Sequence, residues 1–440
     1  MKDIKIIQCE FKHFTRNPFK ILSLILFVGA TIYGLQNGYA LFSKQNKEIE
    51  VIETKNKKNI AEVVSWYDAG KKGPDDKSWI DVTKPIQAIQ YTPATAIKAP
   101  SSFMPFSIGQ AEQFGYYKQI MDWSMTFDTD LAEEIANPER LAIGTLDFSF
   151  VILYLLPILV IILLFNIGGL EKDLGFDRLI QINHTSSQTW LLSRFTFYFL
   201  LINIILFLLM LIYAVRTGVL FGSFFLLYLL IVLYVLLWFA VFYFINHKGT
   251  GSSNQAIKMA SVWLLFCVIV PGTIHQIVSI KYPSDYMTDY IDTSRDKTYK
   301  IYFLSADTIK KNLIVAYPEL AETVQGRDTV ADKSIMSNST SGLVNQLMKE
   351  AAVKIENNNE NKNRFIRSTS WFNPVSWFQN RINALCQTDY YAYRQYRINI
   401  QAMIDKKVEI LLRDSWNKVN MDKEKFLEYV NAFKGNKSSL

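Results

Sequence analysis

The sequence predicts a mainly α-helical membrane protein with five transmembrane helices and a largely helical extracytoplasmic domain. Hydrophobic residues make up 50% of the 440-residue chain, but they gather in long runs from which charged residues are almost absent. A buried helix of a soluble protein seldom lacks a polar face over such a length. Each run approaches the roughly 20 residues with which a helix crosses the hydrocarbon core of a bilayer. The predicted transmembrane helices are residues 21–41, 146–167, 195–215, 220–245 and 259–280.

Residues 1–20 predict an amphipathic helix that lies on the cytoplasmic surface of the membrane. Its apolar residues follow one another at steps of three and four, so they share one helical face, with lysines opposite. Such a helix binds at the interface between lipid and water. It can serve as a simple anchor or as a lever that touches a cytoplasmic partner, and the periodicity alone favours the anchor. The apolar residues are Ile4, Ile7, Phe11 and Phe14.

The positions of lysine and arginine predict which ends of the helices face the cytoplasm. Short cytoplasmic segments carry an excess of these residues. The excess lies before the first transmembrane helix, between the second and third, and between the fourth and fifth. We therefore expect a cytoplasmic N-terminus, an extracytoplasmic C-terminus, and extracytoplasmic positions for the two large polar regions, 42–145 and 281–440. The basic residues concerned are Lys2, Lys5, Lys12, Arg16, Lys20, Lys172, Arg178, Arg194, Lys248 and Lys258.

The two polar regions differ in their expected secondary structure. Residues 42–145 contain several prolines and few long periodic runs, which indicates short helices with irregular connections. In the second region, residues 305–363 are expected to be helical and to end in an asparagine-rich loop, 357–363. Asn373-Pro374 is typical of a helix start, and an apolar stripe between residues 400 and 411 predicts a further helix.

Several kinds of chemistry lack support in the sequence. The nearest approach to a phosphate-binding loop, residues 249–253, lacks the lysine. The histidines are solitary, so no metal site is expected. The net charge of +7 is spread along the chain rather than clustered, which argues against nucleic acid as a partner. The predicted spans contain almost no ionisable groups, which disfavours an intramembrane enzyme. We expect neither catalysis nor a cofactor in this chain.

Two features next to the second predicted span carry polar chemistry. Asp147 stands at its outer end, where a carboxylate that caps the free N–H groups of a helix is the better interpretation. The connection 168–194 begins with acidic residues and continues with a short apolar surface. Such an element fits a groove on a partner protein, and composition alone supports a simple re-entry loop equally well.

The connection 168–194 resembles the signature between the second and third helices of ABC-2 type permeases. The acidic–basic–acidic start and the following glycine carry this resemblance, although Phe176 stands where that family usually has threonine. The resemblance implies a coupling segment that contacts a cytoplasmic ATPase. The residues to which it assigns this contact are Glu171, Lys172, Asp173, Gly175, Phe176 and Leu179.

Motifs in the polar regions resemble a bacterial branch of that family with large extracytoplasmic insertions and an uncharacterised substrate. They occur in the same order along most of the chain. The matching positions are Gly109, Gln110, Asp147, Asn373, Pro374, Asp389 and Tyr390.

The resemblance implies the permease subunit of a transporter in the bacterial inner membrane. ATP and Mg would then bind to a partner, the cytoplasmic ABC ATPase, and a second permease copy or a paralogue would complete the assembly. The alternative is a non-transporting membrane scaffold or sensor with an extracytoplasmic binding domain. The family usually has six transmembrane helices, whereas this sequence predicts five.

Overall fold

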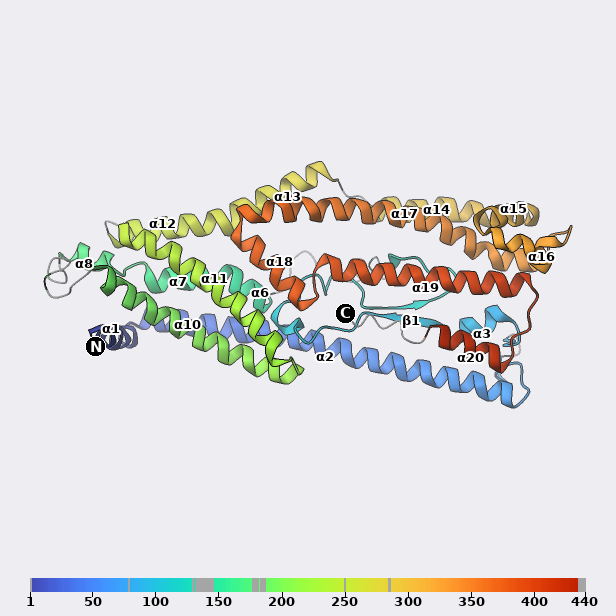
Figure 1. Ribbon diagram of the computed structural model, residues 1–440, viewed down its shortest axis with the longest axis horizontal. Coiled ribbons are helices and arrows are strands. Elements are labelled where there is room, and N and C mark those ends of the chain that lie inside the picture. Colours follow the sequence, from blue (N-terminus) through green and yellow to red (C-terminus); the bar gives the residue numbers. More distant parts are fainter. Residues whose placement is uncertain are drawn as a thin grey trace.

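The chain forms an elongated, mainly helical molecule with an apolar helix bundle at one end and a polar helical head at the other, seen in a computed structural model (Figure 1). The structure describes residues 2–77, 80–128, 130, 146–175, 182, 187–248, 251–283 and 286–433. We use "bundle" for the first part of α2 together with α6 to α13. We use "head" for the rest of α2 and for the elements that surround it.

Five helices within the described part of the chain are long and apolar enough to cross a membrane. They coincide with the five predicted runs, so the prediction of a mainly helical chain with five apolar helices of spanning length is confirmed, and we call them the five spanning helices in chain order. The third helix begins at Ser187, inside the predicted connection 168–194. The five consist of α2 (Pro18–Asp68); α6, η2, α7 and α8 (Phe148–Phe150, Val151–Leu155, Leu156–Leu164, Gly169–Asp173); α10 (Ser187–Thr217); α11 (Phe221–Lys248); and α12, η3 and α13 (Ser252–Leu264, Leu265–Ile269, Val270–Lys281).

Helix α2 does not stop at the membrane boundary that the sequence suggested. It has 51 residues, a length of about 77 Å, whereas the hydrocarbon core is about 30 Å thick. The prediction of short, irregular elements from residue 42 onward was therefore wrong for residues 42–68. Val63 and Trp66 near its end are buried against the head, and pairs one turn apart, such as Lys44 with Glu48, add a little stability to the helix. A single rigid rod thus joins the bundle to the head (Figure 1).

Two glycines on α2 permit unusually close backbone contact. A Cβ atom on Gly34 would lie 2.7 Å from the carbonyl carbon of Asp147, and one on Gly38 would lie 2.7 Å from Cα of Pro105. Only glycine tolerates these distances without a shift of the neighbouring backbone. The α2 rod is therefore seated directly on the start of the second spanning helix and on η1 (Met104–Phe106).

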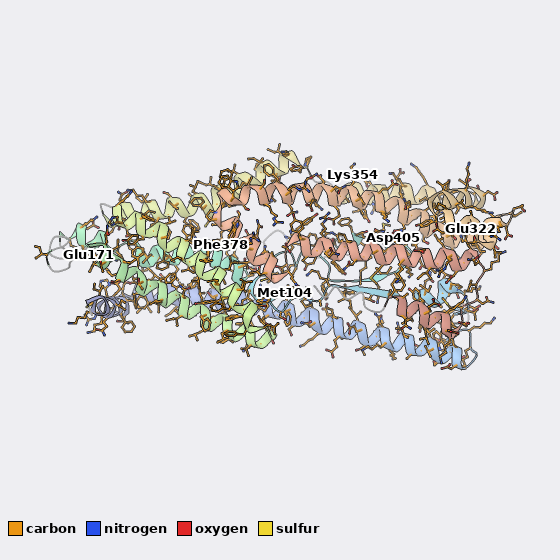
Figure 2. The ribbon with its side chains drawn as sticks, viewed as in Figure 1. Met104, Glu171, Glu322, Lys354, Phe378 and Asp405 are labelled. Carbon is orange, nitrogen blue, oxygen red and sulfur yellow. The ribbon has the colours of Figure 1, made fainter. Side chains whose placement is uncertain are left out.

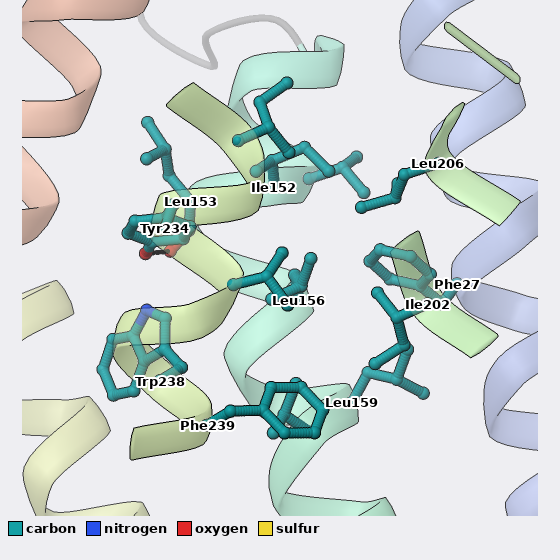
Figure 3. Close-up of a cluster of buried hydrophobic side chains, with 14 of the residues drawn as sticks. Phe27, Ile152, Leu153, Leu156, Leu159, Ile202, Leu206, Tyr234, Trp238 and Phe239 are labelled. Carbon is teal, nitrogen blue, oxygen red and sulfur yellow. Dashed lines mark hydrogen bonds between the residues drawn. The ribbon is translucent and has the colours of Figure 1, made fainter. Parts of the chain in front are cut away.

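The core of the bundle is apolar, and side chains of neighbouring helices donate hydrogen bonds to backbone carbonyls of the second spanning helix. Pro157 has no N–H group, so the carbonyl of Leu153 loses its usual helical donor. The hydroxyl of Tyr234 donates to that carbonyl at 2.6 Å, and Nε1 of Trp263 donates to the carbonyl of Tyr154 at 3.1 Å. These bonds hold the π-helical turn η2 against α11 and α12, while Leu156 lies at the centre of the core (Figure 3).

The head is built from helices and one small antiparallel sheet. In the sheet, Ala94 lies opposite Ile120 and Ile97 lies opposite Tyr117. The predicted apolar stripe between residues 400 and 411 is buried in the head, as expected. The elements are α3 (Pro85–Tyr91), β1 (Ala94–Ile97), β2 (Tyr117–Ile120), α14 (Tyr286–Tyr302), α15 (Ala306–Ala316), η4 (Pro318–Glu322), α16 (Val324–Arg327), α17 (Lys333–Thr369), η5 (Ser370–Phe372), α18 (Pro374–Cys386), α19 (Tyr390–Trp416) and α20 (Lys423–Ala432).

The predicted loop at residues 357–363 is wrong, because this segment lies inside α17. Composition alone suggested a loop, but tertiary contacts hold the helix. Glu360 pairs with Nη1 of Arg394 at 2.9 Å, and Glu356 pairs with Arg397 on the neighbouring helix α19. These ion pairs hold the asparagine-rich helical turn against α19, because Glu356 and Glu360 flank it on that face.

Helix α18 leaves the head and packs into the bundle. The ring of Phe378 lies 4.9 Å, centroid to centroid, from the ring of Tyr234 on α11, and Val375 and Ile382 belong to the same apolar core. With 13 residues, α18 is about 20 Å long and too short to cross. It enters from the head side and returns to the head through α19, so the described chain has no sixth long apolar helix.

The glycine contact gives a direct test of how α2 is seated. We expect Gly34→Ala to lower the free energy of unfolding by roughly 1–3 kcal/mol, because its Cβ would overlap the backbone of the second spanning helix. The measurement is thermal unfolding of the full chain in detergent. Gly29→Ala on the same helix is the control, since no atom lies within 4 Å of its Cβ position. Equal unfolding midpoints for the two variants would contradict the close seating.

Candidate functional site

The end of the bundle that lies farthest from the head gathers the N-terminal helix and the predicted coupling segment. Helix α1 (Lys2–Thr15) lies there against the start of α10, and α8 lies there against the start of α12 (Figure 1). Glu171 of α8 lies near this extreme end (Figure 2). The basic residues that suggested a cytoplasmic side therefore share one end of the molecule, apart from Arg178, which lies outside the described residues.

A buried cluster of charges joins these elements, and we call Glu10, Lys20, Glu171, Arg194 and Tyr198 the basal cluster. Nε of Arg194 donates to Oε2 of Glu10 at 2.6 Å, and its Nη1 donates to Oε1 of Glu171 at 2.5 Å. The Tyr198 hydroxyl donates to Oε1 of Glu10 at 2.7 Å. Nζ of Lys20 donates to the Tyr198 hydroxyl at 3.0 Å. Helices α1, α2, α8 and α10 are thus joined by one polar network.

The basal cluster is nearly free of solvent and its formal charges balance. Glu10 is 4% exposed, Lys20 1% and Arg194 6%. Burial by itself raises the pKa of Glu10, but the charge and hydrogen bond of Arg194, with help from Tyr198 and Lys20, hold that pKa below its ordinary value. A buried charge is tolerated only when partners of opposite charge and hydrogen bonds compensate it. Loss of one member would leave the others uncompensated.

Sequence reasoning missed Glu10 as a site residue, although a signal was present. Glu10 stands three residues after Ile7 and four before Phe14, so it lies on the apolar face of α1. An acid on such a face indicates a buried partner. Phe14 is itself buried, and its ring lies 6.1 Å from that of Tyr198. Part of the predicted lipid-facing stripe therefore contacts α10, while Phe11 stays 55% exposed.

The predicted coupling segment also binds the start of the fifth spanning helix. Oδ2 of Asp173 accepts the backbone N–H of Ser252 at 3.0 Å, as an N-cap from another segment. A Cβ atom on Gly169 would lie 2.6 Å from Oε1 of Gln255, and one on Gly251 would lie 2.7 Å from Oδ1 of Asp173. Helix α8 therefore lies directly against the start of α12.

Of the remaining coupling residues, the structure describes Lys172 and Gly175. Lys172 is exposed on α8, and Gly175 follows the helix with φ +74°, the left-handed conformation that commonly ends a helix. Leu174 between them is 58% exposed. Phe176 and Leu179 lie outside the described residues.

The motif residues of the polar regions meet at the junction of bundle and head, which we call the neck. Gly109 has φ +50°, and a Cβ atom there would lie 2.6 Å from the carbonyl oxygen of Thr388. The backbone N–H of Gln110 donates to the same carbonyl at 2.9 Å. Only glycine at residue 109 allows this close approach of the two loops.

Three neck residues cap helices, as the sequence predicted for the first two. Asp147 accepts the N–H of Phe150 at 2.7 Å and, with its other oxygen, the N–H of Ile108 at 2.9 Å. Asn373 accepts the N–H of Val375 at 3.0 Å, with Pro374 in the first turn of α18. Asp389 caps α19 in the same way. The hydroxyl of Tyr390, the next residue, donates to Glu356 at 2.9 Å.

A cavity of about 550 Å³ opens at the neck, and Gln110, Asp389 and Tyr390 are among its lining residues. Lys98 lies nearby, where its Nζ donates to the carbonyl of Gln387 at 2.9 Å and sits 4.4 Å from the ring centroid of Tyr393. Burial lowers the pKa of Lys98 to about 8, although the negative charge of Asp389 opposes this shift. The neck is thus polar and partly dehydrated.

The structure therefore gathers the predicted residues at two places, the basal cluster and the neck. Within the described ranges, no group of three or more His, Cys, Asp or Glu side chains could hold a metal ion. Comparison of the chain with protein-family models, with curated proteins and with solved structures finds no match.

The basal cluster predicts a large penalty for loss of its central cation. We expect Arg194→Met to lower the free energy of unfolding by roughly 3 kcal/mol or more, because Glu10 and Glu171 would lose their shared partner. Thermal unfolding in detergent measures the effect. The matched control is Arg216→Met at the other end of α10, where the side chain is exposed and stacks on Tyr213. A similar midpoint for both variants would refute a central role for Arg194.

Proposed function

We propose that the chain is the permease subunit of an ABC-2 type transporter in the cytoplasmic membrane of a bacterium. In this proposal the basal cluster faces the cytoplasm and the head is extracytoplasmic. A separate ATPase binds ATP and Mg, hydrolyses the ATP, and acts on this chain through α8. The chain itself then works as a mechanical element rather than as an enzyme.

The observation that carries the proposal is the way α8 is connected to the bundle. Glu171 binds Arg194 at the start of α10, and Asp173 binds the start of α12. Arg194 in turn binds Glu10 on α1, which shares Tyr198 with Lys20 on α2. A displacement of α8 is therefore passed to four helices through hydrogen bonds and ion pairs. Rigid-body shifts of packed helices are a common form of such transitions.

The outward side of α8 offers a surface for a partner. Lys172 and Leu174 are both exposed there, so an apolar side chain stands beside a charged one. Short amphipathic elements of this kind fit grooves on partner proteins. Glu171 and Asp173 hold α8 to the bundle, whereas Lys172 and Leu174 face outward, and this separation lets the segment bind a partner without leaving the bundle.

The fifth spanning helix supports the expectation of a second permease copy or a paralogue. In its most apolar window only 11% of the residues are buried, against 61% for the second spanning helix. Its apolar surface is available to lipid and to another subunit. In a dimer of permeases this helix has the most surface to contribute.

A second candidate function is a membrane scaffold or sensor without transport. The continuous helix α2 favours it, because one rigid rod of 51 residues connects the basal cluster to the head. Such a rod passes a signal across the membrane as readily as it passes a mechanical stroke. Association with an ATPase separates the two candidates.

The proposal predicts that the tagged full chain co-purifies from its native membranes with a protein that contains a phosphate-binding loop. We expect Leu174→Asp to abolish this association and the ATPase activity of the complex, because the exposed apolar contact becomes charged. Val330→Asp, at an exposed apolar position in the head, is the control and should keep both. Undiminished association of the Leu174→Asp variant would exclude α8 as the coupling element, and absence of any ATPase would favour the scaffold.

Membrane orientation is testable with a native cysteine. Cys9 is exposed, whereas Cys267 and Cys386 are buried. In spheroplasts, a membrane-impermeant maleimide should label the Val330→Cys variant at once and should label Cys9 only after permeabilisation. The Cys9→Ser variant gives the background. Labelling of Cys9 in sealed spheroplasts would reverse the proposed orientation.

A further inference from the structure

The neck cavity lies inside the turn that α17, α18 and α19 make where they meet the bundle. Its volume is about 550 Å³, within the range of roughly 300–1,000 Å³ that is usual for small-ligand pockets. Five segments contribute to its wall: the end of α17, the short helix η5, the helix α18, the start of α19, and the loop that contains Gln110. Because these segments are fixed by caps and by the Gly109 contact, the cavity is built into the fold.

Two arginines give the cavity a positive rim. Arg367 from α17 and Arg381 from α18 both line it, and neither has a carboxylate within 4 Å among the residues that the structure places. Asp389 also lines the cavity, but Oδ1 of its carboxylate is used to cap α19. The cavity therefore has more positive than negative charge.

Aromatic rings hold both guanidinium groups in place. The guanidinium of Arg367 lies 5.1 Å from the ring centroid of Tyr391, and that of Arg381 lies 5.4 Å from the ring centroid of Trp377. A stacked guanidinium keeps its N–H donors free for a planar or tetrahedral anion. Both arginines thus keep N–H donors available at the rim of the cavity.

Two buried amide atoms on the wall have no hydrogen-bond partner within the described structure. They are Oε1 of Gln110 and Nδ2 of Asn380. Buried polar atoms are normally paired, and these two leave one acceptor and one donor available in the cavity wall. A phosphate oxygen can accept from Asn380, and a hydroxyl group can donate to Gln110.

The surroundings of the cavity are apolar on the side of the bundle. Trp371, which also lines the cavity, is 72% exposed and Phe372 beside it is 61% exposed, while Phe378 of α18 lies in the bundle core (Figure 2). Tryptophan with one polar and one apolar neighbour is typical of the interface between headgroups and acyl chains. A ligand in this cavity would meet arginines at its polar end and aromatic rings at its apolar end.

We propose that the neck cavity binds the phosphate-bearing, hydroxylated headgroup of an anionic amphiphile, with the phosphate between Arg367 and Arg381 and the acyl chains along Trp371 and Phe372. This assignment concerns a binding site and does not depend on the coupling to an ATPase. The same headgroup chemistry could reach the cavity as a soluble phosphate ester, and the experiment below separates the two sources.

The test measures lipid binding to the purified full chain by native mass spectrometry in a neutral detergent. We expect saturable binding of phosphatidylglycerol and no comparable binding of phosphatidylcholine. The Arg367→Gln/Arg381→Gln variant should bind phosphatidylglycerol at least about tenfold more weakly, because each charge-assisted contact is lost. The control is Arg327→Gln/Arg364→Gln, which removes the same charge from α16 and α17 at positions that do not line the cavity.

A second variant tests the site if the double variant folds poorly, and a competition experiment distinguishes the two sources of the headgroup. Asn380→Asp conserves size but adds a negative charge to the wall, so it should also weaken binding even if the double variant folds poorly. Displacement of the lipid by millimolar glycerol 3-phosphate would assign the site to the soluble ester, and resistance to it would assign the site to the amphiphile. The proposal fails if phosphatidylglycerol binds the double variant and its control equally, or if phosphatidylcholine binds as well as phosphatidylglycerol.

Discussion

The packing of helices at the end of the bundle farthest from the head depends on the charge of Arg194. Its guanidinium is the only contact that joins Glu10 of α1 to Glu171 of α8 in the described basal cluster, and Lys20 completes the charge balance through Tyr198. Inside a membrane protein an unpaired charge is costly, so these helices are held in one arrangement. The same constraint explains why Tyr234 donates to the carbonyl that Pro157 leaves without a partner.

At the end of the bundle next to the head, close backbone contacts rather than charges hold the segments together. Gly34 and Gly38 seat α2 on the second spanning helix and on η1, and Gly109 seats the neighbouring loop on Thr388. These contacts form the neck, where α18 enters the bundle and returns. Helix α2 runs past both regions as one rod. A movement that begins at α8 can therefore reach the head through α2, and the neck cavity lies beside that path.

Local patterns predicted a good part of the fold and some of the neck. The five apolar runs became the five long helices, and Asp147 and Asn373 cap helices as their positions indicated. Local patterns failed where distant residues decide the outcome. Residues 357–363 look like a loop, yet α19 holds them in α17 through Glu356 and Glu360. The polar half of α2 remained unrecognised because much of it is polar, and its apolar residues, such as Val63 and Trp66, are buried only against distant segments of the head.

The sequence by itself determined that the chain belongs in a membrane, because long runs without charge have no stable place in water. It also determined where several helices begin, since caps depend on neighbouring residues. Only the tertiary structure decided that Glu10 meets Arg194, that α18 returns without crossing, and that two arginines share one cavity. These features depend on contacts between residues far apart in the chain, and no local pattern records which distant residue will compensate a buried charge.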